Sequence, residues 1–223
     1  MSHSYYDNLP ENSNLIFHSP LIEAGGTRIH DLSKGHNSGD FLAAGEPAWS
    51  QTGTTWTLNF DGSNDRVVLP VAITTGVTTA LYACAWFYYT AAAVDKTIIH
   101  AVSASSPRAL VLRSNAVDIT TDAAPGTFKE SNWTQPVAGW HFIELLYNGA
   151  GLTGYIDFVA GASPGSVTGN LVTLTTFWMG ASPNNGGEWW LNGRIGQVRI
   201  YNSALSLGQR ENIYYSTRAL YGV

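Results

Sequence analysis

The sequence predicts an all-β protein, a sandwich or a barrel, from three observations. Short runs rich in Val, Ile, Thr, Tyr, Phe and Trp recur along the chain, separated by clusters of Gly, Asn, Pro and Ser. Charged residues make up only 12% of the 223, whereas hydrophobic residues make up 44%, so the chain can bury a large core. The chain has no internal repeat and no linker. We therefore expect one domain over residues 1–223, with its core at about 14–215 and a short arm at each end.

Ten segments are expected to be strands because β-branched and aromatic residues dominate them. In chain order these are residues 14–17, 55–60, 66–69, 79–89, 96–102, 109–113, 140–147, 153–158, 173–179 and 193–201. Regular short strands of this kind are typical of sandwiches and barrels. Cys84 is the only cysteine and lies within the fourth of these strands, where we expect a buried and inert thiol.

Two reversals between strands are marked by their residues. Asn148-Gly149 predicts a hairpin, because this pair supplies the positive φ angles of a tight turn. The stretch FDGSND, residues 60–65, predicts a second turn, with the Phe60 ring in the core. Gly62 and Asn64 are expected to take the unusual backbone angles there, and the two aspartates to accept hydrogen bonds from the turn's own amides.

One helix is expected near the end of the chain. Ser206 and Gln209 fit a capping box, in which each side chain satisfies a backbone N–H of the first turn. The helix is expected to run to about Arg218. The aromatic segment 214–223 and residues 1–14 are expected to be arms that dock on a partner.

Charge and composition argue against several classes of protein. The net charge is −5 and the chain has no basic run, which argues against nucleic-acid binding. Its apolar runs are too short and too polar to insert into a membrane. The N-terminal residues have neither a basic start nor an apolar core, so no signal peptide and synthesis in the cytoplasm are expected. A single cysteine excludes an intrachain disulfide and a cysteine-rich zinc site.

Five segments, in their order and spacing, resemble the laminin G-like, concanavalin A-like family of lectins and glucanases. They are the loop 29–37, the FDGSND turn, Ala85-Trp86, Gly139-Trp140-His141, and Met179-Gly180 followed by residues 191–206, the most specific of the five. The resemblance implies a two-sheet antiparallel jelly-roll β-sandwich with one short C-terminal helix. It also implies a domain that is usually a non-catalytic recognition or adhesion module, although fold alone does not fix function.

The same family includes polysaccharide hydrolases and lyases, so an enzyme is an alternative. A retaining glycosidase needs two carboxylates beside the bond, and the family's E-x-D-x-x-E strand pattern does not occur here. Glu144 and Asp157 lie on neighbouring expected strands and are read as isolated, solvent-facing polar residues. Ser163 matches the letters of a nucleophile elbow, but Pro164 follows it and no strand-to-helix turn is expected. No catalytic residue is assigned, and we do not expect an enzyme.

Calcium is the one cofactor that the resemblance implies. In the family, calcium often sits between the opening loop and the final strand, and the matching residues are Asp31 and Gln197. Gln197 is an amide where an acidic residue is expected, which weakens a site that needs six to eight oxygens. The alternative is that Asp31 accepts hydrogen bonds from amides of its own loop.

Aromatic residues in polar loops are the candidates for ligand binding, because sugars stack on exposed aromatic faces. The candidate set is Trp189, Trp190, Glu188, Trp133 and Asn185. If Trp189 and Trp190 lie on a strand, one faces the core and the other solvent. The alternatives are that both are packed or that they form a subunit interface.

Together these features predict a non-catalytic recognition or structural module. We expect it on the surface of a larger assembly such as a virion, or otherwise extracellularly, where it serves decoration, adhesion or glycan binding. A free-standing lectin-like carbohydrate-binding module is the alternative, and a polysaccharide hydrolase or lyase is the third reading. The partner is then a surface glycan or protein, and a homo-oligomer stays open.

Overall fold

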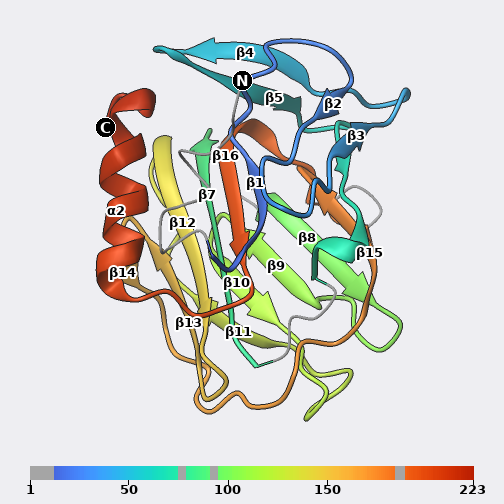
Figure 1. Cartoon of the computed structure of the whole chain (residues 1–223), viewed down its shortest axis with the longest axis vertical. Helices are drawn as coiled ribbons and strands as arrows, with labels where there is room; N and C mark the ends of the chain where they lie inside the picture. The colour runs from blue at the N-terminus through green and yellow to red at the C-terminus, as the bar shows by residue number, and fades with distance from the viewer. Residues whose placement is uncertain (1–12, 75–78, 91–94, 184–188) are drawn as a thin grey trace.

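The structure is a computed structural model that describes residues 13–74, 79–90, 95–183 and 189–223. Two antiparallel sheets pack face to face, and a C-terminal helix lies against one of them (Figure 1). This is the predicted jelly-roll β-sandwich. Among the described residues, no helix has the length and apolar character needed to cross a membrane.

The first sheet, here sheet A, contains the long central strands of the molecule. Its strands follow the order β14 (Val159–Ala160), β13 (Leu152–Ile156), β12 (Gly139–Tyr147), β7 (Leu81–Tyr89), β16 (Asn192–Tyr201), β5 (Thr55–Asp61) and β4 (Ala48–Thr52), with β1 (Leu15–Ser19) also paired to β16.

The second sheet, here sheet B, has eight strands in the described part of the chain. Its order is β11 (Lys129–Asn132), β10 (Ala116–Ile119), β9 (Leu110–Arg113), β8 (Thr97–Ser103), β15 (Leu174–Met179), β6 (Val67–Val68), β3 (Gly39–Phe41) and β2 (Arg28–Ile29). A short 3-10 turn, η2 (Val71–Thr74), follows β6.

Strand β7 shows why this sequence builds two cores. Side chains alternate along a strand, so Ala83, Ala85 and Phe87 point between the sheets, into the main core. Cys84 and Trp86 point to the opposite face of sheet A and join a second apolar cluster. Because both faces of β7 are covered, nearly every residue of this strand is apolar and buried. Burial also raises the pKa of the Cys84 thiol to about 12, as expected for an inert cysteine.

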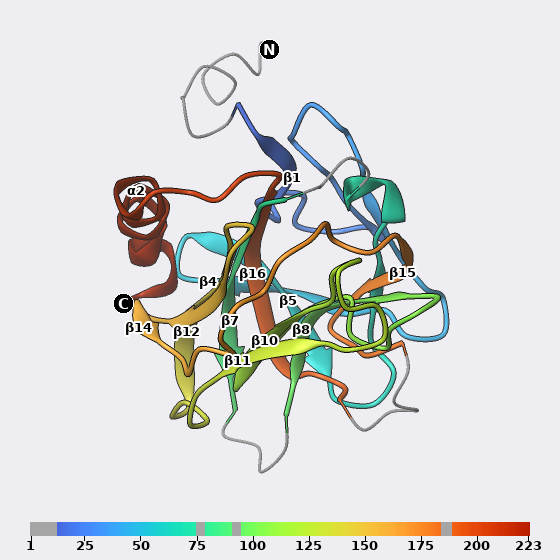
Figure 2. The same ribbon diagram turned by 90° about the horizontal axis from the view of Figure 1, so that it is seen from below.

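The second cluster is closed by the C-terminal helix α2 (Leu207–Thr217) and the following turn η3 (Arg218–Tyr221), on the side away from sheet B (Figures 1 and 2). The helix begins at the predicted capping box, with both reciprocal hydrogen bonds formed. The Trp86 ring stacks on Tyr214 and Tyr221, with centroids 5.4 and 4.8 Å away, and its Nε1 donates to Thr217 Oγ1 at 2.8 Å. Residues 214–223 were expected to be an arm that docks on a partner, whereas Tyr214, Thr217 and Tyr221 pack on Trp86 within this chain.

Each of the ten predicted strands has a counterpart in the structure, and the Asn148-Gly149 hairpin joins β12 to β13 with Gly149 at φ +83°. In the FDGSND turn, the Phe60 ring is buried, Asp61 accepts from Ser63 N and Asp65 from Asp61 N, each at 2.8 Å. Gly62 has φ +84° as predicted, but Asn64 does not have a positive φ, so that part of the prediction is wrong.

Candidate functional site

Helix α2 covers the outer face of sheet A, where the carboxylates Glu144 and Asp157 were candidates for a catalytic pair. Glu144 on β12 is fully buried beneath it and accepts from Tyr82 Oη at 2.8 Å and Arg210 Nη1 at 3.1 Å. Asp157 instead accepts from Phe142 N at 2.8 Å and contacts His141 Nδ1 at 2.7 Å. The prediction that Glu144 faces solvent is wrong, because the sequence did not show that a helix covers this strand.

The loop at Asp31 has the geometry of the alternative to a calcium site, in which Asp31 accepts hydrogen bonds from amides of its own loop. Asp31 is buried, and its two carboxylate oxygens accept from His18 N, Ser33 N and Ser33 Oγ at 2.8 Å and from Asn37 N at 2.7 Å. Gln197 lies on β16, and its amide oxygen can accept from Arg199 Nη2 at 3.0 Å. Within the described ranges no three His, Cys, Asp or Glu residues form a metal-binding group. Calcium at Asp31 and Gln197 stays a prediction.

The outer face of sheet B is where polar and aromatic side chains gather. Strand pairing places the following residues in one row across seven strands: Asp40, Val68, Trp178, His100, Val111, Asp118 and Glu130. Residues directly paired across antiparallel strands point to the same face. The row therefore lies opposite the main core, on the side of the sandwich that α2 does not cover.

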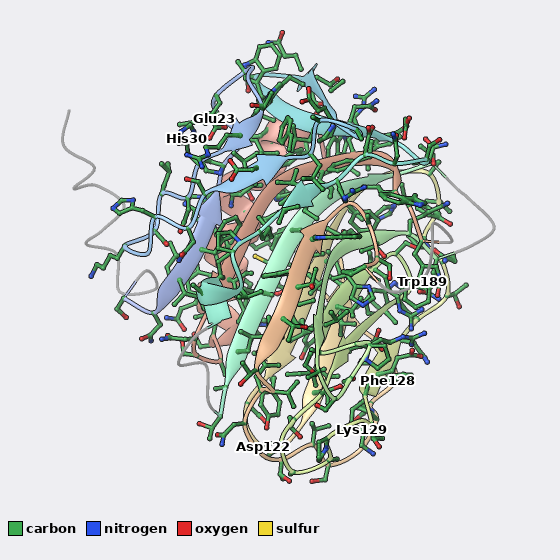
Figure 3. The ribbon with its side chains drawn as sticks, turned by 90° about the vertical axis from the view of Figure 1, so that its right-hand side faces the viewer. Glu23, His30, Asp122, Phe128, Lys129 and Trp189 are labelled. Carbon is green, nitrogen blue, oxygen red and sulfur yellow. The ribbon has the colours of Figure 1, made fainter. Side chains whose placement is uncertain are left out.

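Trp189 lies over the middle of this face, at the centre of a group of cationic and aromatic side chains that we call the Trp189 cluster: Trp189, His100, Arg108, Arg113 and Phe128. The Arg108 guanidinium stacks between two rings, 4.6 Å from the Trp189 centroid and 4.3 Å from that of Phe128. Arg113 lies 5.4 Å from the Trp189 ring, and the His100 ring lies 5.9 Å from it. Figure 3 shows Trp189 and Phe128 on the same side of the molecule, far from Glu23 and His30.

Three carboxylates hold these two arginines in place. Arg113 Nε donates to Asp118 Oδ2 at 3.2 Å, and the rest of its guanidinium pairs with Asp95 and Glu130. Arg108 Nη1 lies 3.3 Å from Glu130 Oε2. Because guanidinium groups held by several carboxylates cannot rotate freely, the Trp189 cluster presents its polar groups at fixed positions.

Burial shifts the titration of two groups in this network. It raises the pKa of Asp118 to about 7, although Arg113 and Arg108 oppose the shift. Burial lowers the pKa of His100 to about 4, so His100 is neutral near pH 7. Its Nε2 lies 2.7 Å from the carbonyl of Pro107, which makes Nε2 the protonated nitrogen and leaves Nδ1 as the acceptor.

Trp190 lies against a second cation on the same face. The Arg66 guanidinium is 5.7 Å from the Trp190 ring and 4.9 Å from the Trp178 ring, on the β6 and β15 side of the sheet. Trp189 and Trp190 are both half-buried and belong to the loop before β16, not to a strand. The condition under which one would be core and the other exposed, a position on a strand, is therefore not met.

The other candidate residues do not join this group. Trp133 packs against the main core and donates from Nε1 to the Ser114 carbonyl at 3.0 Å. Glu188 and Asn185 lie outside the described residues. The structure thus brings together two of the five residues, Trp189 and Trp190, on one face.

A family model described as the concanavalin A-like lectin/glucanases superfamily, in its laminin G form, matches residues 61–209, which is more than half of the chain. The chain belongs to this family. No curated protein matches its sequence.

Solved structures from several organisms have the same fold as this laminin G-like chain. The binding domain of Paraclostridial Mosquitocidal Protein 1 is 13% identical with a TM-score of 0.67, over 92% of this chain and 53% of that one. Trypanosoma rangeli sialidase in complex with sialic acid is 15% identical with a TM-score of 0.65, over 95% and 34%. Domain 4 of AbnA, an extracellular arabinanase of Geobacillus stearothermophilus in complex with arabinotriose, is 16% identical with a TM-score of 0.63, over 90% and 98%.

The chain thus spans about half of the mosquitocidal binding domain and about a third of the sialidase. Identities this low establish a shared fold and nothing more specific. The residues of the site must therefore be argued from this laminin G-like chain itself.

The site residues that the sequence analysis missed are His100, Arg108, Arg113 and Phe128, together with Arg66 near Trp190. A usable signal was present for one of them. Arg113 ends an otherwise apolar run, Leu110–Arg113, just as Asp118 interrupts Ala116–Ile119. A lone charge inside a short apolar strand indicates a buried ion pair, since buried charges are usually paired.

Proposed function

We propose that this protein is a non-catalytic glycan-recognition module and that the outer face of sheet B binds the sugar through Trp189 and Trp190. The observation that carries the proposal is the Trp189 cluster, in which an indole lies beside arginines fixed by carboxylates on a rigid sheet. A sugar ring offers C–H surface that packs on an aromatic face and hydroxyls that pair with fixed polar groups. Binding sites of this kind combine apolar contact with a few well-placed polar groups.

The charges of the Trp189 cluster favour a neutral sugar over an acidic one. Arg108 and Arg113 supply two positive charges, and Asp95 and Glu130 supply two negative charges within the same network. Asp118, with its pKa of about 7, adds a further partial negative charge near neutral pH. The cluster therefore has no surplus of positive charge to bind an acidic glycan.

A non-catalytic recognition role also fits the pairing of the carboxylates with arginines. Asp118 and Glu130 are tied to Arg113, and Glu144 is tied to Arg210 beneath helix α2. A glycosidase needs two carboxyl groups placed on either side of a bound sugar. Display on a larger assembly such as a virion stays a prediction from the sequence, with a free-standing lectin-like module as its alternative.

Affinity electrophoresis in gels that contain neutral soluble polysaccharides, followed by a glycan array, tests the proposal. We expect at least one neutral polysaccharide to retard the protein, and Trp189→Ala to weaken that binding by about tenfold or more, as for a central aromatic contact. Tyr215→Ala is the matched control, because Tyr215 is an exposed aromatic on helix α2. Equal binding by Trp189→Ala and wild type, or equal loss in Tyr215→Ala, would contradict the proposal.

A further inference from the structure

A pocket lies on the opposite side of the molecule from the Trp189 cluster, where helix α2 and η3 meet strands β1 and β16. Its volume is about 520 Å³. Side chains of Ile213, Leu220 and Leu32 give it apolar walls, and His18, Gln197 and Arg199 supply its polar groups. The residues come from four separate segments of the chain, so the pocket exists only in the folded protein.

Arg199 is the unusual member of this group. Its exposed fraction is 8%, yet no carboxylate of the described residues lies within salt-bridge distance. Among the described residues its guanidinium contacts neutral groups, Tyr201 Oη at 3.5 Å and the Gln197 amide oxygen at 3.0 Å. The other two arginines buried to this degree differ, because Arg113 pairs with Asp118 and Arg210 pairs with Glu144.

Within the described part of the chain, the groups around Arg199 do not supply a compensating negative charge. His18 pairs with it across β1 and β16, and burial together with the charge of Arg199 lowers the pKa of His18 to about 3. His18 is therefore neutral near pH 7 and does not compete for an anion. A buried charge is costly unless an opposite charge or several hydrogen bonds compensate it.

We propose that this pocket binds a small organic carboxylate, whose charged group pairs with the Arg199 guanidinium while its apolar body packs against Ile213, Leu220 and Leu32. A guanidinium matches a carboxylate in a planar, two-bond geometry. The apolar walls favour an organic ligand over an inorganic oxyanion. This site is separate from the proposed glycan surface and does not depend on it.

Isothermal titration calorimetry with benzoate, benzamide and sulfate at constant ionic strength tests the proposal. Benzoate is expected to bind saturably with a dissociation constant on the order of 1 mM or lower. Benzamide has the same ring without the charge and is expected to bind at least tenfold more weakly. Absence of benzoate binding, equal binding of benzamide, or sulfate binding as tight as benzoate binding would each overturn it.

A variant at Gln197, compared with a control variant at Gln51, tests whether benzoate binds at Arg199. Gln197→Glu places a carboxylate of the chain's own beside the guanidinium, and we expect it to raise the unfolding temperature while weakening benzoate binding at least tenfold. Gln51→Glu on β4 is the control for an added charge at an exposed glutamine. Unchanged benzoate binding in Gln197→Glu would overturn the site.

A second variant, at the exposed residue Asn212, tests the same site even if Gln197→Glu does not fold. Asn212 lies on the solvent side of helix α2 and also lines the pocket, so Asn212→Asp should fold normally. The added charge should weaken benzoate at least threefold, through like-charge repulsion, and leave benzamide unaffected. Equal benzoate affinity in Asn212→Asp and wild type would place the binding elsewhere and overturn the proposal.

Discussion

Removing one oxygen atom, in Tyr221→Phe, tests whether the C-terminal segment is part of the fold. Strand β16 has an irregularity between Ile195 and Val198 in its pairing with β7. The N–H of Gln197 instead donates to Tyr221 Oη at 2.8 Å. Gly196 makes this approach possible, since a Cβ there would lie 2.5 Å from the Tyr221 ring.

The expected cost follows from the burial of that hydrogen bond. Tyr221 is 4% exposed, so Tyr221→Phe leaves a buried N–H without its acceptor and should cost about 1–3 kcal/mol. For a chain of this length that corresponds to a fall in Tm of about 2–12 °C. Tyr221→Ala also removes the ring from Trp86 and Trp140, whose centroids are 4.8 and 4.7 Å away. Its cost should reach about 3–5 kcal/mol.

Urea unfolding followed by Trp fluorescence, together with calorimetry, measures both variants. Tyr215→Phe is the control, because Tyr215 is 59% exposed and its substitution should change stability by less than about 0.5 kcal/mol. If Tyr221→Phe unfolds at the wild-type midpoint, or Tyr221→Ala is no less stable than Tyr221→Phe, the segment does not pack as described.

Two further predictions concern a glycine and a carboxyl group. Gly180 and Gly165 have nearly equal φ angles, +83° and +85°, but a Cβ at Gly180 would overlap the Phe60 ring, whereas one at Gly165 would meet open space. Gly165→Ala should lower the free energy of unfolding by about 1–2 kcal/mol through backbone strain. Gly180→Ala should lower it further, because its Cβ also overlaps the Phe60 ring. Equal urea midpoints for the two variants would contradict this. Burial raises the pKa of Asp118 to about 7, so the folded protein holds the neutral carboxyl more tightly than the unfolded chain does. The stability that this neutral carboxyl provides is fully present below about pH 4 and is lost as the pH rises towards 7. Asp118→Asn should therefore gain stability relative to wild type between pH 4 and pH 8, by about 1.4 kcal/mol for each unit of pKa difference; a pH-independent difference in unfolding free energy would refute it.

The fold could be predicted largely from local patterns. The long strands with β-branched or aromatic runs, such as β7 and β12, were recognisable. The strands that were missed are two to five residues long, and several, such as β4 and β11, carry mostly polar residues. Their pairing depends on neighbours distant in sequence, which a local pattern does not contain.

The site was predictable only in part, for the same physical reason. Trp189 and Trp190 stood out because two indoles follow a turn-rich loop. Arg108 and Phe128 are 20 residues apart in the sequence and meet only where β9 and β11 flank β10 in sheet B. Glu144 was misread because nothing within β12 indicates that Arg210, 66 residues later, will pair with it beneath a helix.

Helix α2 gives the sandwich a distinct front and back. It closes the outer face of sheet A, and the Trp189 cluster lies on the opposite side of the molecule (Figures 1 and 3). A particle or resin that held the protein by the exposed side of α2 would orient every copy with sheet B pointing outward. With many copies fixed in this way, the proposed glycan binding would engage a repetitive polysaccharide at several points at once, so weak contacts at each Trp189 would add up to strong attachment.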